Sequence, residues 1–190
     1  MEDYQQIAFQ KLSSIHAYTN NMDYHMHNFY EIYLILEGDV NLYIKNSCYH
    51  ITSSSVAVIN SLDPHKLTNT ENSFTRIYFH IPDTFTSRFS DQKTNLSECF
   101  NNRIAGNNVL LLSHLQKDYI LDIFNKMTQC KDNKHNHFGV NLLFDTYVIQ
   151  LLIYINNLYN GQSFISPSQY SPDVAFITEY IDSHILENIT

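Results

Sequence analysis

The chain has 190 residues and a formal net charge of −8; 44% of its residues are hydrophobic and 16% are charged. This composition supports a folded core and is not typical of a disordered chain. The negative charge argues against a nucleic-acid interface on this chain, because such an interface needs a basic surface. We expect a soluble, cytoplasmic protein with reduced thiols and no membrane partner, because the three cysteines lack paired spacing and neither a signal peptide nor an apolar run of ~20 residues is present.

The first 14 residues hold a short apolar pattern, Ile7 and Phe9, which is typical of a short strand or a mobile arm. The stretch from Asp23 to Gly38 follows and predicts a long strand. Residues of one parity would share a face that carries polar and aromatic groups: His25, His27, Phe29, Glu31, Tyr33 and Ile35. The opposite parity is apolar: Tyr30, Ile32, Leu34 and Leu36. A strand with an apolar far side needs a cover, so we expect helices from later in the chain to pack on it.

Further short strands are expected over residues 40–45, 49–52, 56–59 and 74–81, with turn signals between them. Residues 60–64 form a loop that leads to His65. On the last of these strands, Arg76, Tyr78 and His80 share one face. Short strands at intervals of about 8–12 residues indicate an all-β sandwich or barrel, which here ends at Pro82.

The period of the pattern becomes helical after the barrel. Residues 83–100 predict one short helix. Ser113 and Gln116 form a capping-box pattern, which opens a second helix that ends before a polar loop at residues 131–137. A third, amphipathic helix is expected over residues 140–159, so that the two long helices form an antiparallel pair.

The C-terminal end of the chain has two distinct parts. Residues 161–172 are rich in serine, proline and glycine, which is typical of a linker. Residues 173–190 place apolar side chains at helical spacing and predict a final amphipathic helix.

Two motifs carry a family resemblance. The spacing His-x-His-x-x-x-Glu-(x6)-Gly from His25 to Gly38 resembles the first cupin motif, and Pro64-His65 with Asn69 is similar to the end of the second. The usual glycine and upstream proline of the second motif are replaced by residues 53–55, Ser-Ser-Ser, and by Asn60. The run His-Met-His-Asn-Phe-Tyr-Glu-Ile over residues 25–32 more closely resembles the N-terminal effector domain of AraC-type transcriptional regulators.

This resemblance implies a mainly β fold with C-terminal helices, in which a cupin-like jelly-roll barrel (residues 1–82) precedes a helical dimerisation or cover segment (83–160). It also implies a linker (161–172) and, in residues 173–190, the first helix of an incomplete DNA-binding domain that stops before its helix-turn-helix motifs. The implied protein is not an enzyme. It binds a small-molecule effector, a sugar or other metabolite, in the barrel and contacts DNA only through the missing C-terminal domain.

The candidate effector-binding residues combine both lines of reasoning: His25, His27, Glu31, Tyr33, His65, Arg76 and Tyr78. Our leading interpretation is a pocket of hydrogen-bonding groups without a cofactor. The alternative is a divalent transition metal held by His25, His27, Glu31 and His65, because imidazoles and a carboxylate suit iron, manganese, nickel or zinc. A bound metal would point to a cupin metalloenzyme, an oxygenase or isomerase, or to a sensor whose sole ligand is the metal ion.

The apolar stripe over residues 140–159 has two possible uses. It can cover the apolar face of the sheet, or it can pair with a second copy of the chain. The family resemblance favours a homodimer, and we assign Leu151, Ile155 and Leu158 to its interface.

Overall fold

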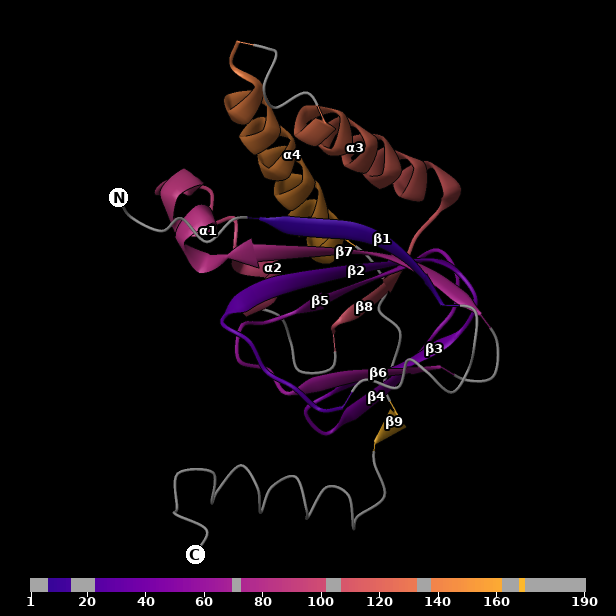
Figure 1. Cartoon of the computed structure of the whole chain (residues 1–190). Helices are drawn as coiled ribbons and strands as arrows, with labels where there is room; N and C mark the ends of the chain where they lie inside the picture. The colour runs from indigo at the N-terminus through magenta and orange to yellow at the C-terminus, as the bar shows by residue number, and fades with distance from the viewer. Residues whose placement is uncertain are drawn as a thin grey trace, which may run out of the picture.

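Two antiparallel sheets face one another in the computed structural model of this chain, and helices cover the outer face of the first sheet (Figure 1). The structure describes residues 7–14, 23–69, 73–101, 107–132, 138–161 and 168–169. The sheets do not join into one continuous barrel, but their arrangement confirms the predicted class, a mainly β, jelly-roll-like fold followed by helices.

The first sheet has the strand order β1-β7-β2-β5-β8, with the bounds Ala8–Ser14 (β1), Phe74–Pro82 (β7), Phe29–Glu37 (β2), Ser55–Ile59 (β5) and Val109–Leu111 (β8). The second has the order β6-β3-β4-β9, with the bounds His65–Asn69 (β6), Val40–Ile44 (β3), Ser47–Ile51 (β4) and Ser168–Gln169 (β9). The sequence did not predict β6 or β8. The first has one aliphatic residue, Leu67, and the second is only three residues long, so neither shows a readable alternation.

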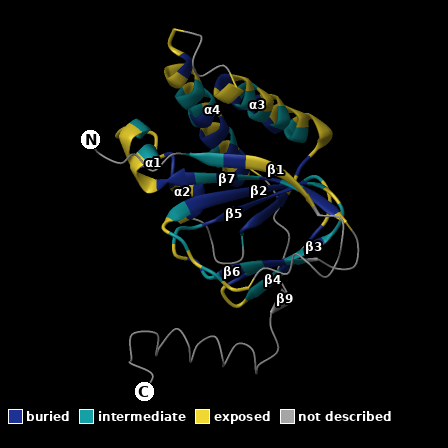
Figure 2. Cartoon of the chain, viewed as in Figure 1, coloured by how far each residue is buried: buried dark blue, intermediate teal, exposed yellow. Residues whose placement is uncertain are grey.

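Strand β2 has the two faces that its alternation predicted. Tyr33 and Ile35 point between the sheets and pack with residues of β3, β4 and β6. Ile32 and Leu34 point outward and pack with residues of the long helices. Figure 2 shows the resulting buried layer along β2 and β5. The helices therefore cover the apolar side of this strand, as expected.

The segment before β2 departs from the predicted strand. The strand begins at Phe29, and His25 lies outside it in an isolated antiparallel bridge with His65. In that bridge each backbone N–H donates to the carbonyl of the other residue at 3.1 Å. The leading histidines are thus held against the second sheet, whereas Glu31 belongs to the first.

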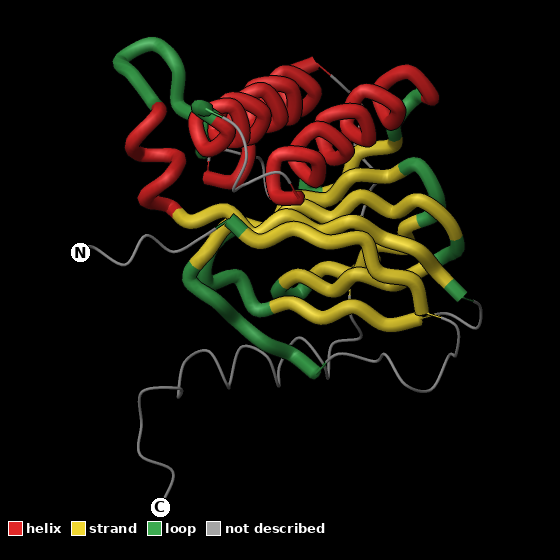
Figure 3. Tube along the Cα trace, turned by 45° about the horizontal axis from the view of Figure 1, so that its top comes forward, coloured by secondary structure: helices red, strands yellow, loops and turns green. Residues whose placement is uncertain are grey.

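The helices are α1 (Asp83–Phe89), α2 (Glu98–Asn101), α3 (His114–Asp132) and α4 (Val140–Gly161). Residues 83–100 therefore contribute to two short helices, where the sequence predicted one. The capping box that predicted the start of α3 is present: the Ser113 N–H donates to Gln116 Oε1 at 2.8 Å, and the Gln116 N–H donates to Ser113 Oγ at 3.4 Å. Helices α3 and α4 lie together over the first sheet (Figure 3).

The side chains that we assigned to dimerisation are buried inside the chain itself. Leu151 and Ile155 are 0% exposed and Leu158 is 7% exposed, all within the core that joins α4 to the first sheet. A second copy could reach them only if this core came apart. The stripe on α4 is used to cover the sheet, and the assignment of these three residues to a dimer interface is wrong.

The two ends of the chain are described only in part. Residues 8–14 of the predicted arm form β1 and pair with β7 over their whole length. In the predicted linker, Gly161 ends α4 and Ser168–Gln169 pair with β4. The helix predicted over residues 173–190 lies outside the described residues. Within the described part, no helix combines the length and the apolar character needed to cross a membrane.

Candidate functional site

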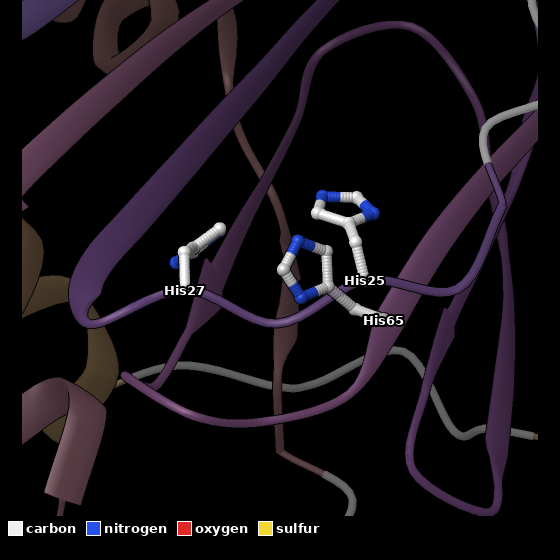
Figure 4. A group of neighbouring side chains, drawn as sticks. All are labelled: His25, His27 and His65. Carbon is white, nitrogen blue, oxygen red and sulfur yellow. The ribbon is translucent and has the colours of Figure 1, made fainter.

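Three histidines from two segments of the chain lie close together (Figure 4). His25 and His27 precede β2, and His65 opens β6. The ring centroid of His65 lies 4.2 Å from that of His25 and 4.8 Å from that of His27. One ring nitrogen from each can lie within 4.8 Å of the other two. The backbone bridge between His25 and His65 sets this spacing, which brings together three residues of the predicted site.

Each of these imidazoles is oriented by a backbone carbonyl. Nδ1 of His25 donates to the Asp23 carbonyl at 3.0 Å, that of His27 to the Phe29 carbonyl at 3.0 Å, and that of His65 to the Asp63 carbonyl at 2.8 Å. A carbonyl oxygen only accepts, so each Nδ1 carries the proton. In the neutral ring, Nε2 is then an unprotonated donor of an electron pair.

Glu31 lies at the centre of the cluster and is 2% exposed. Its Oε2 is 3.2 Å from Nε2 of His27 and 3.0 Å from Nε2 of His65, and its Oε1 is 2.7 Å from Nε2 of His80. The His65 contact is within ion-pair distance but is not aligned as a hydrogen bond; among the described residues, this buried Nε2 has no hydrogen-bond partner. Both oxygens of the carboxylate therefore face histidine nitrogens.

Two pKa shifts follow from this arrangement. Burial by itself raises the pKa of Glu31, but the contacts from His27, His65 and His80 outweigh it and hold that pKa well below its usual value. Burial is the main cause of a lowered pKa at His25, and the neighbouring His65 adds to it, against the Asp23 carbonyl, which raises it. The site thus combines an ionised carboxylate with an imidazole that favours its neutral form.

His80 belongs to this cluster, although the sequence did not place it among the site residues. It lies on β7, directly opposite Glu31 on β2 in the strand register. The alternation of β7 had grouped it with Arg76 and Tyr78, which was the available signal. Its contact with Glu31 depends on how the two strands align, and alternation within one strand does not show that alignment.

The other predicted residues extend the polar face along the first sheet. Burial raises the pKa of Tyr33 well above its usual value; Glu31 adds to this effect, and Arg76 opposes it. The Arg76 guanidinium lies 4.8 Å from the centre of the Tyr33 ring. The Tyr78 ring contacts His80 at 4.5 Å between centroids, and its hydroxyl donates to Gln10 Oε1 on β1 at 3.3 Å. A continuous series of contacts therefore joins the histidine cluster to Arg76 and to β1.

Comparison with known proteins identifies this type of domain. The family model described as the AraC-like ligand binding domain matches residues 12–152. A search of curated proteins finds no match.

Among solved structures, an apo ToxT variant from Vibrio cholerae is 14% identical, with a TM-score of 0.52 over 100% of this chain and 69% of that one. Wild-type ToxT from the same organism, bound to an unsaturated fatty acid, is 17% identical, with a TM-score of 0.52 over 100% of this chain and 68% of that one. A cupin-family protein from Methanocaldococcus jannaschii overlaps 40% of this chain with a TM-score of 0.36. At these identities, the ToxT likeness shows a shared fold.

The family match covers strands β2 to β8, the histidine cluster and more than half of α4. This chain therefore belongs to the family of AraC-like ligand-binding domains, the effector-sensing part of an AraC-type transcriptional regulator.

Proposed function

We propose that the effector of this regulator binds on the inner face of the first sheet, against the cluster of Glu31 and its histidines. The observation that carries the proposal is a buried, ionised carboxylate between two sheets whose inner faces also carry an apolar cluster. A buried carboxylate costs stability unless it is well paired, and the histidines provide that pairing here. The carboxylate gives a ligand-binding domain a polar anchor for its ligand.

The cluster is built so that a ligand can reach it. Glu31 and His65 form its buried base, with side chains 2% and 1% exposed. His27 and His80 form a more open rim, with side chains 13% and 28% exposed. Polar groups at the base and aromatic rings along the wall suit a small metabolite that carries several hydroxyl groups, such as a sugar.

A thermal-shift screen of sugars, organic acids and fatty acids tests this proposal; fatty acids are included because ToxT binds one. A true effector should raise the melting temperature of the wild-type chain and lose most of this effect in Glu31→Gln and Arg76→Ala. A compound that stabilises both variants as well as it does the wild type binds elsewhere. In a chain extended by the helix-turn-helix half, the effector should also change DNA affinity, because it must bind one arrangement of the two halves better than the other.

A divalent transition metal is a second candidate ligand, and a specific observation favours it. Nδ1 of His27 and Nδ1 of His65 each donate to a backbone carbonyl. When these rings are neutral, both Nε2 lone pairs face the ionised carboxylate of Glu31. Lone pairs and a carboxylate repel one another unless a positive charge lies between them, which is either a metal ion or a proton on Nε2; the His27 contact has the geometry of such a hydrogen bond. A carbonyl on Nδ1 is also the usual second partner of a metal-binding histidine.

The two distances from Oε2 of Glu31 fit such an ion. Two ligand atoms at right angles on bonds of about 2.1 Å lie about 3.0 Å apart, and Nε2 of His27 and His65 lie 3.2 and 3.0 Å from Glu31 Oε2. His25 would supply the third nitrogen. The ion would act as a Lewis acid or as the sensed ligand itself, and only the first of these uses would make the domain an enzyme.

Elemental analysis of protein purified without a His-tag or added metal tests this candidate. A near-stoichiometric transition metal that is lost in His65→Ala supports it. A folded, metal-free protein that takes up no added zinc or cobalt excludes it and leaves the organic effector.

Homodimerisation through the helices is the third part of the proposal. The outer sides of α3 and α4 leave large apolar side chains in solvent, among them Leu115 at 82% and Leu142 at 68% exposure. A second copy would cover them and gain the free energy of that burial. Sedimentation at tens of micromolar should show a dimer that Leu115→Glu with Leu142→Glu disrupts; a wild-type monomer would exclude this interface.

A further inference from the structure

We infer that His80 is a positioning residue for the proposed metal site: it holds Oε1 of Glu31, so that Oε2 faces His27 and His65. The inference rests on that proposal, but His80 lies outside both motifs that pointed to the site. It is a fourth histidine, contributed by another strand.

The contact between His80 and Glu31 is the shortest in the cluster. Nε2 of His80 lies 2.7 Å from Oε1, compared with 3.0 and 3.2 Å for the contacts of His65 and His27 with Oε2. The pairing of β2 with β7 places the two residues directly opposite each other. Hydrogen bonds to an ionised acceptor are short and strong, so this bond restrains rotation of the carboxylate about its last side-chain torsion.

The ring of His80 is itself held in place. The centroid of the Phe29 ring, on β2, lies 4.3 Å from that of His80, and the centroid of the Tyr78 ring, on β7 like His80, lies 4.5 Å from it. Its neighbour on β1 is Ala8, whose small side chain leaves room for the imidazole. Packing and strand register thus fix the donor before any ligand arrives.

This arrangement gives the two oxygens of Glu31 separate tasks. Oε1 accepts a hydrogen bond from His80, whose side chain is 28% exposed, and Oε2 is directed at His27 and His65, whose side chains are 13% and 1% exposed. A metal site tolerates misplacement of its ligands by only about 0.5 Å. Loss of a partner that orients a ligand typically weakens metal affinity about 10- to 100-fold.

The experiment is a Co²⁺ titration of the whole chain, followed by absorption spectroscopy and equilibrium dialysis, in wild type, His80→Ala and His80→Gln. We expect His80→Ala to bind Co²⁺ about 10- to 100-fold more weakly, with a changed visible spectrum. His80→Gln should recover part of the loss, because its side-chain amide can also donate to Oε1. The control is His50→Ala. His50 also bonds a cross-strand partner, Asn41 at 3.1 Å, but it lies exposed on β4.

Wild-type affinity and spectrum in His80→Ala would overturn the inference and leave the metal site standing. If the wild type binds no Co²⁺, the metal site fails, and ¹⁵N and ¹³C NMR of the imidazole and carboxylate then decide the role of His80. A protonated Nε2 in His80, with a Glu31 carboxylate signal that moves in His80→Ala but not in His50→Ala, supports the positioning role. An unprotonated Nε2 or an unmoved signal overturns it.

Discussion

Phe9 joins the N-terminal strand to the long helices, and its replacement by alanine should loosen that strand. The ring is 7% exposed and packs against Phe79 of β7, Phe124 of α3 and Phe144 of α4, at centroid distances of 6.3, 5.7 and 5.7 Å. Phenylalanine-to-alanine changes in a core cost about 3–5 kcal/mol. Because β1 is an edge strand and can relax partly into the gap, we expect about 3 kcal/mol, a large share of the 5–15 kcal/mol typical of a domain.

The assay is urea denaturation followed by far-UV circular dichroism, with Leu12→Ala as the matched control. Leu12 lies three residues further along β1, on its opposite face, and is 36% exposed. Its replacement should cost less than about 1 kcal/mol. If Phe9→Ala costs no more than Leu12→Ala, the contacts between β1 and the helices do not stabilise the domain, and a freely mobile arm would be the better description of residues 8–14.

Three further variants test other parts of the structure. Glu31→Gln removes a carboxylate whose pKa is lowered in the fold from its ordinary value of 4.5. The ionised carboxylate stabilises the fold above this value, and its contribution is lost as the pH falls through the lower folded pKa. The unfolding free energies of variant and wild type should therefore differ by about 2 kcal/mol near neutrality and converge in acid; a constant difference would contradict the reasoning. Gly38→Ala should cost about 2 kcal/mol in thermal unfolding, because Gly38 has φ of +81° and an added Cβ would collide with the Ser73 carbonyl; an unchanged melting temperature would mean that the turn adapts. Ser113→Ala removes one half of the capping box and should cost about 1 kcal/mol, whereas Ser113→Asp should restore most of that loss, and equal losses in both variants would show that the cap is not the cause.

Features that depend on neighbouring residues could be predicted from the sequence alone. The two faces of β2 followed from parity, because successive side chains on a strand point to opposite sides whatever lies beyond them. Ser113 and Gln116 predicted the start of α3, because their contact is made within one turn. The spacing of apolar residues also correctly predicted an amphipathic helix at α4. Composition and motif spacing were sufficient for the fold class and the family.

The contacts between residues that are distant in the sequence depend on the three-dimensional fold. Glu31 contacts His80 because β2 and β7 align in one particular register, and it contacts His65 because the chain crosses between the sheets before β2. The fold also determines what the apolar stripe of α4 packs against: Leu151 faces the first sheet. An amphipathic face shows that a helix needs a partner, but it does not show which one. A sheet within the same chain is always present, whereas a second copy must first be bound at a cost in entropy.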